Sequence, residues 1–105
     1  MDNIERFYKR YAFPVELDVT PAKELSVVAM NTSNIDVGGI DYHADGYDIL
    51  MTFFYTGKKW IFVLKNDNNE IDVANIASVY QGSGTQNQAT FTAKYISEIF
   101  NNKIH

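Results

Sequence analysis

The chain contains no cysteine, which excludes disulfide bonds, thiolate-ligated metal centres and a cysteine nucleophile. Only two of its 105 residues are proline, and no apolar run approaches the roughly 18 residues that a membrane-spanning helix needs. The first six residues, Met-Asp-Asn-Ile-Glu-Arg, lack the basic start and apolar stretch of a secretory signal. These absences predict a cytoplasmic protein whose stability comes from side-chain packing alone.

The composition is that of one ordinary globular domain spanning residues 1–105, with 46% hydrophobic and 21% charged residues. Seven Phe, seven Tyr and one Trp provide large side chains for a core. Nine basic and thirteen acidic residues give a formal net charge of -4, which disfavours nucleic acid as a partner. The excess of Lys over Arg and the many Asn and Ile residues favour an AT-rich bacterial or phage genome.

Local patterns at the start of the chain predict a helix followed by strands. Asp2 can cap the helix, and Pro14 ends it. Apolar and polar residues alternate over 15–20, and residues 25–30 form a more apolar run, so both segments are predicted strands. The apolar face of the helix comprises Ile4, Phe7, Tyr8 and Tyr11.

Two turn signals in the middle of the chain predict a three-stranded antiparallel meander. Asp45-Gly46 is typical of a type I′ turn and Gly57-Lys58 of a type II′ turn, while Gly38-Gly39 indicates a bulge. Residues directly opposite in an antiparallel pair share a face. The resulting core face pairs Ala44 with Tyr47, Tyr42 with Ile49, Ile40 with Met51, Met51 with Leu64, Phe53 with Phe62, and Tyr55 with Trp60.

The C-terminal part predicts one or two helices. Asp72 can cap a helix over 73–80, although a strand is an alternative for this short segment. Thr85 and Gln88 match a capping box at the start of a helix that reaches residue 102. The predicted fold is therefore a single α+β domain with an N-terminal helix, an antiparallel β-meander of about five strands, and one or two C-terminal helices packed on the sheet.

The second face of the predicted meander mixes apolar and charged residues. If the helix over 72–80 covers it, the face is a second small core; if not, it has the apolar centre and polar rim of a protein interface. Its apolar centre is Leu50, Phe54, Ile61 and Val63. Its acidic end is Asp36, Asp41 and Asp48, next to His43, and the basic residues Lys59 and Lys65 are assigned to the other end.

Residues 36–48 hold four Asp and one His, a composition that raises the question of a cation site or a general base. An EF-hand does not fit, because His43 falls at a ligand position and Thr52 stands where a bidentate Glu belongs. Asp41 or Asp48 can orient His43 as a base, yet no nucleophile or cofactor motif accompanies it. Hence no catalytic residue, metal or cofactor is predicted.

Two further patterns have simpler explanations than ligand binding. Residues 82–85, Gly-Ser-Gly-Thr, precede a predicted helix but lack the Lys of a P-loop, so they are predicted to be a connector. Tyr55 and Trp60 resemble base-stacking residues, but they share a face with Ile49, Met51 and Leu64, which favours core packing.

The leading hypothesis is a small non-catalytic binding or regulatory protein that acts by protein–protein interaction, either as a homodimer or on a partner with a basic patch. A first alternative is a structural or assembly subunit, for example of a phage particle. A second is a minor enzyme or ligand-binding domain centred on His43. The predicted interaction residues are Leu50, Phe54, Ile61, Val63, Asp36, Asp41, His43 and Asp48.

Overall fold

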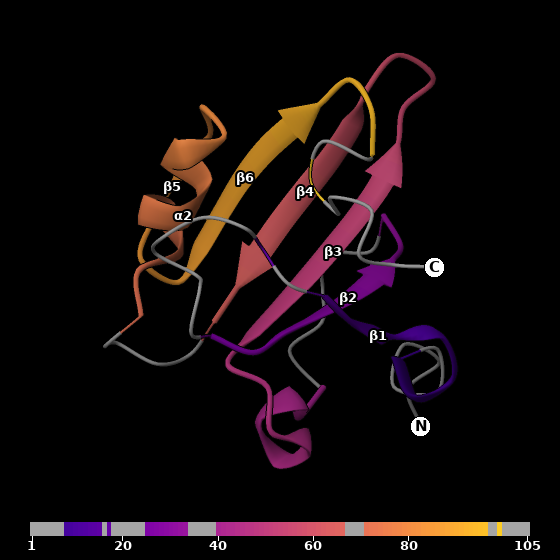
Figure 1. The fold of residues 1–105 in the computed structure, drawn as a ribbon, viewed down its shortest axis with the longest axis vertical. Helices are drawn as coiled ribbons and strands as arrows, with labels where there is room; N and C mark the ends of the chain where they lie inside the picture. Colours follow the sequence, from indigo (N-terminus) through magenta and orange to yellow (C-terminus); the bar gives the residue numbers. More distant parts are fainter. Residues whose placement is uncertain are drawn as a thin grey trace.

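A computed structural model describes residues 8–15, 17, 25–33, 40–66, 71–96 and 99. Its strands form one six-stranded sheet in the order β1-β2-β3-β4-β6-β5 (Figure 1). Residues 8–11 are helical and precede β1. The α+β prediction is confirmed. The elements are β1 (Phe13–Val15), β2 (Val27–Asn31), the 3-10 helix η2 (Tyr42–Asp45), β3 (Ile49–Tyr55), β4 (Trp60–Lys65), α2 (Val73–Val79), β5 (Ser83–Gly84) and β6 (Gln88–Ala93).

The sheet is mixed, because β2 and β3 run parallel while every other neighbouring pair is antiparallel. Val27 lies beside Ile49 and Asn31 beside Phe53. In the predicted meander, β3 pairs with residues 40–44, which come just before it in the chain. That segment instead forms part of the crossover that a parallel pair requires.

The predicted hairpin at Asp45-Gly46 is wrong, since residues 42–45 form η2 instead of a strand. The Asp41 carboxylate accepts a hydrogen bond from the Ala44 N–H at the start of η2. Gly46, with φ of +90°, caps its C-terminus. A type I′ turn and a helix C-cap both need a left-handed residue, so Asp-Gly indicates the local conformation without distinguishing the two. The predicted pairs across this turn therefore do not form.

The predicted hairpin at Gly57-Lys58 is confirmed with its register. Gly57 has φ of +100°, as the first central position of a type II′ turn requires. The observed cross-strand pairs are Tyr55 with Trp60, Phe53 with Phe62 and Met51 with Leu64.

The helix over 73–80 is confirmed as α2, capped by the Asp72 carboxylate, which accepts the Ala74 N–H at 3.0 Å. The long helix predicted from Thr85 is wrong, because residues 88–93 are strand β6. The Gln88 N–H does donate to the Thr85 hydroxyl, but this bond closes the β5–β6 turn. Along β6 the buried side chains Ala89, Phe91 and Ala93 alternate with the exposed Gln88, Thr90 and Thr92.

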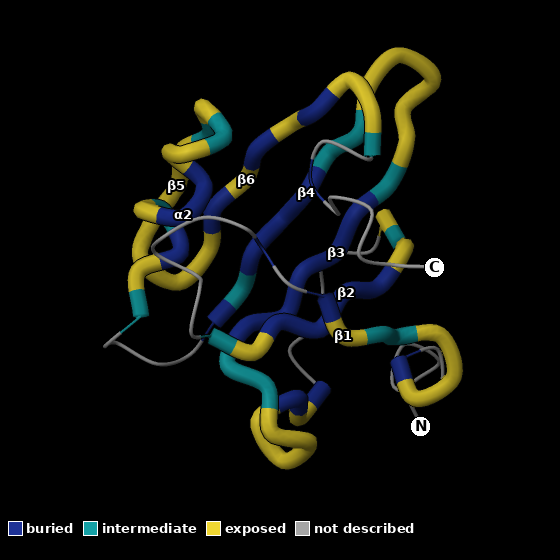
Figure 2. Tube along the Cα trace, in the orientation of Figure 1, coloured by how far each residue is buried: buried dark blue, intermediate teal, exposed yellow. Residues whose placement is uncertain are grey.

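Each face of the sheet carries its own core. The central strands β2, β3 and β4 are buried along much of their length (Figure 2). On the first face α2 packs through Ile76 and Ala77 against the aromatic cluster of Phe62 and Phe91. On the second face Leu50 packs with Val28, Met30, Tyr8, Ile40 and Tyr42. The possibility that the helix over 72–80 covers the mixed face is therefore wrong, since α2 packs on the opposite face.

Candidate functional site

The four apolar residues of the predicted interaction face differ in burial: two are buried and two are half-buried. Leu50 is fully buried beneath Tyr8 and Tyr42, and Val63 is 7% exposed. Phe54 and Ile61 are cross-strand partners and remain half-buried. Only this second pair offers apolar surface to a partner, so the predicted apolar centre is smaller than the sequence indicates.

The two predicted acidic residues that the structure describes, Asp41 and Asp48, accept hydrogen bonds from backbone N–H groups. Asp41 caps η2, and the Asp48 carboxylate accepts the Ser26 N–H at 2.9 Å. The Nδ1 atom of His43 lies 3.0 Å from the Tyr47 carbonyl oxygen, so the hydrogen bond that orients this exposed ring is to the backbone. The strand predicted to carry His43 is wrong, because η2 replaces it. Asp36 lies outside the described residues.

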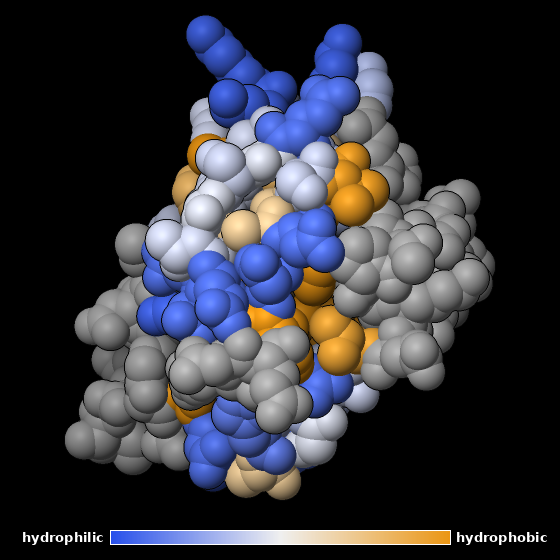
Figure 3. Space-filling view, turned by 90° about the vertical axis from the view of Figure 1, so that its left-hand side faces the viewer, coloured by the Kyte–Doolittle hydropathy of each residue, from blue (hydrophilic) through white to orange (hydrophobic). Residues whose placement is uncertain are grey.

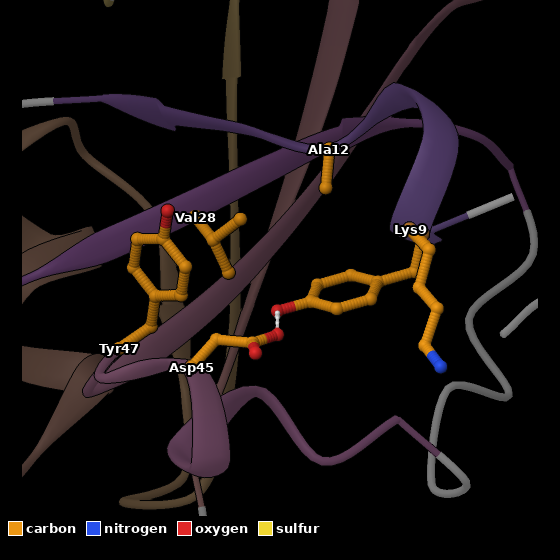
Figure 4. Close-up of a pocket in the computed structure, with 6 residues that line it drawn as sticks. Lys9, Ala12, Val28, Asp45 and Tyr47 are labelled. Carbon is orange, nitrogen blue, oxygen red and sulfur yellow. Dashed lines mark hydrogen bonds between the residues drawn. The ribbon is translucent and has the colours of Figure 1, made fainter. Parts of the chain in front are cut away.

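An open pocket of about 380 Å³ lies between the helical residues 8–11, β2 and η2 (Figure 4). The Tyr8 hydroxyl points across it and donates to the Asp45 carboxylate at 2.7 Å. Burial of the ring, followed by this hydrogen bond, raises the pKa of Tyr8 well above its ordinary value. The pair is thus a neutral donor held against an anion. Six residues line the pocket: Tyr8, Lys9, Ala12, Val28, Asp45 and Tyr47.

The pocket lining includes both apolar and polar side chains. Ala12, Val28 and the Tyr47 ring form the apolar wall, and Lys9 and Asp45 are the charged residues of the lining (Figure 4). Four of the six lining residues carry a polar group, and a pocket of this volume suits a small molecule or one protruding side chain of a partner. The sequence placed Tyr8 on an apolar helix face and Asp45 in a turn. A buried Tyr hydroxyl needs a hydrogen-bond partner. Because Asp45 is 37 residues away in the sequence, no local pattern predicts that it is the partner of Tyr8.

A second surface lies at the other end of β3, and we call it the basic end: Tyr55, Lys58, Lys59, Trp60, Lys94 and Tyr95. Tyr55 is 53% and Tyr95 58% exposed. Lys59 precedes Trp60, which pairs with Ala93, so the residue after Ala93, Lys94, lies at the same end. Long hydrophilic side chains project there in the space-filling view (Figure 3). The sequence placed Lys59 and Lys65 together, but Lys65 pairs with Leu50 at the other end of β3. Lys94 joins Lys59 only through the pairing of β4 with β6, which has no local signal.

The described residues hold no cluster of three potential metal ligands. Among the helices of that same part of the chain, none is long and apolar enough to cross a membrane.

Comparison with known proteins gives a likeness of fold. No family model matches the sequence, and no curated protein sequence matches it. A solved structure with the same fold is that of the pGpG-specific phosphodiesterase PggH from Vibrio cholerae, with a TM-score of 0.59 and 10% sequence identity. The similarity covers 89% of this chain but only 33% of that protein, so the chain spans about a third of its length.

Proposed function

We propose that this chain is a non-catalytic binding domain that recognises another protein through the pocket between residues 8–11, β2 and η2. The observation that carries the proposal is the Tyr8–Asp45 pair at the edge of an open, partly apolar pocket. Asp45 is an exposed carboxylate whose orientation is already set by the Tyr8 hydroxyl. A carboxylate held in place loses little side-chain entropy when a partner binds.

The partner fits best if it presents a lysine or arginine side chain. Such a side chain lays its aliphatic stem on apolar surface and its charge beside an acid, and here Val28 and Tyr47 provide the surface. Asp41 and Asp48 flank η2 and add negative potential that steers a basic partner toward Asp45. This agrees with the basic-patch partner expected from the four Asp residues.

Cross-linked affinity capture from the host lysate tests the proposal with three variants. Asp45→Lys should lose the partner that the wild type captures. Gln88→Lys, which introduces a lysine at an exposed β6 position away from the pocket, should retain it. Loss with Phe54→Glu alone would move the interface to the half-buried Phe54–Ile61 pair. Capture that is equal for all four proteins would refute a protein-binding role for either surface.

Light scattering on the purified chain distinguishes the possible partners. A homodimer that dissociates on Asp45→Lys would identify the partner as a second copy. Ordered higher oligomers would favour the assembly-subunit alternative. A monomer leaves a different protein as the partner, which the capture experiment addresses.

A second candidate function is that of one domain within a nucleotide-hydrolysing enzyme. Its support is the shared fold over a third of the length of the Vibrio phosphodiesterase. Incubation of the chain with pGpG tests it directly, with His43→Ala as the variant because His43 is the one exposed imidazole among the described residues. Turnover that His43→Ala removes would support the enzyme, and absence of turnover would leave the binding role.

A further inference from the structure

We propose that the basic end binds single-stranded nucleic acid, with a base stacked on Tyr55, which Trp60 supports, and phosphates beside the lysines. This inference concerns the opposite end of β3 from the pocket and does not depend on the proposed function. Its residues differ from those that line the pocket, so each proposal can fail by itself.

The aromatic part of the basic end is accessible and fixed in place. Tyr55 and Trp60 are cross-strand partners with ring centroids 5.1 Å apart. The Trp60 ring also contacts Phe53, at 5.9 Å, which anchors it on the core. Tyr55 is 53% exposed, so one ring of an anchored pair is open to solvent. Rigid exposed rings of this kind stack on bases without regard to sequence.

The turn that carries two of the lysines is held by its own hydrogen bonds. The Thr56 hydroxyl accepts the N–H groups of Lys58 and Lys59, each at 3.3 Å. The Thr56 N–H donates to the Lys59 carbonyl at 3.0 Å. A turn closed in this way holds the backbone of both lysines in place before any ligand arrives. Binding then costs little ordering of the chain.

Charge is segregated along β3, which the net value of -4 conceals. Lys58, Lys59 and Lys94 are three of the six basic residues that the structure describes. The four acidic residues of the same part of the chain lie at the other end: Asp41, Asp45 and Asp48 around η2, and Asp72 just after the end of β4. Among the described residues the basic end therefore holds three lysines and no carboxylate, whereas Lys9 and Lys65 lie at the other end with the acidic residues. Screening shortens the reach of the distant carboxylates.

The rings favour nucleic acid over an acidic peptide. Lysines alone attract any polyanion, and a carboxylate gains nothing from an adjacent aromatic face. Lys94 already lies 5.6 Å from the centre of the Tyr95 ring. In a surface where lysines alternate with exposed rings, the lysines can contact the phosphates of a single strand while the rings stack on its bases.

The chain contains one tryptophan, so its fluorescence reports on the basic end. We expect a twelve-nucleotide oligothymidine to quench Trp60 saturably at low salt. The logarithm of the binding constant should fall with the logarithm of salt with a slope of about -2, the value for three lysines on a single strand. Fluorescence anisotropy of a labelled oligothymidine gives the affinities of the variants, including those in which Trp60 is perturbed.

Two matched pairs separate the proposal from nonspecific charge. Lys59→Glu should weaken oligothymidine binding at least fivefold, whereas Arg10→Glu, an equal reversal at an exposed distant site, should change it less than twofold. Tyr55→Ala should weaken it about tenfold, and Tyr11→Ala, which removes a ring that is 56% exposed, should not. All four positions are exposed, and thermal melting confirms that each variant folds.

Three results would overturn the inference. One is the lack of saturable binding at 50 mM salt. Another is equal affinity for oligothymidine and for poly-glutamate, which would make the basic end a site for acidic protein segments. The third is an unchanged affinity of Tyr55→Ala, because the rings would then have no part in binding.

Discussion

The Tyr8 hydroxyl and the Asp45 carboxylate are joined by a 2.7 Å hydrogen bond that ties the helical residues 8–11 to η2. Both segments lie on the second face of the sheet, where Tyr8 and Tyr42 bury Leu50. The bond therefore closes the second core and forms the edge of the pocket. Its removal should affect stability and the proposed binding together.

Tyr8→Phe should lower the free energy of unfolding by about 1.5 to 3 kcal/mol at neutral pH, because it deletes a hydrogen bond to a charged group. The pKa of Tyr8 is raised in the folded protein by burial and by Asp45. This stabilisation is complete below the ordinary tyrosine pKa of about 10 and is lost as the pH rises above it. Denaturant titrations from pH 8 to pH 11 should show a shallower decline for the variant.

Phe91→Ala should cost about 3 to 5 kcal/mol of stability, the range for deleting a buried ring. Phe91 stacks on Phe62 at 5.1 Å and on Tyr80 at 4.6 Å, so it connects β4, β6 and the end of α2. Thr92→Ala, at the exposed neighbouring position, should change the free energy of unfolding by less than about 0.5 kcal/mol. Similar losses for both variants would argue against the alternation along β6.

Asp72→Ala should destabilise the protein by about 1 kcal/mol through loss of the N-cap of α2. The Asp72 carboxylate accepts the N–H groups of Ala74 and Asn75, at 3.0 and 3.4 Å. Asp72→Asn should retain most of the stability, since an amide oxygen caps about as well. Thermal denaturation of the two variants separates the capping bond from the effect of charge.

Gly82→Ala should destabilise more than Gly57→Ala. A Cβ at Gly82 would meet the Thr90 carbonyl oxygen and lie 2.6 Å from the Phe91 Cβ, so the backbone beside β6 would have to shift. A Cβ at Gly57 would meet no other atom, so the only cost of alanine there is the left-handed φ of +100°. An alanine in that conformation costs about 1 to 2 kcal/mol. Chemical denaturation of both variants gives the order, and the reverse order would contradict the close approach at Gly82.

Elements set by residues close in sequence were the ones that could be predicted. The β3–β4 hairpin has its register from one glycine and the alternation on either side of it. α2 follows from its Asp72 cap and its spacing of apolar residues. Patterns shared by two structures were misinterpreted, as Asp45-Gly46 serves a helix C-cap as well as a turn, and the Thr85–Gln88 pair closes a hairpin as well as capping a helix.

By itself the sequence determined the α+β class, the β3–β4 hairpin and the absence of disulfide bonds, because these depend on composition and on short-range conformational preference. Tertiary structure alone decided the parallel pairing of β2 with β3, the strand at 88–93 and the burial of Leu50. It also brought Tyr8 to Asp45 and gathered Lys58, Lys59 and Lys94 at one end. Contacts between distant segments depend on how the apolar faces of helices and strands pack against one another. The favoured arrangement is the one that buries the most apolar side-chain surface over the whole chain, and short-range patterns do not reveal it.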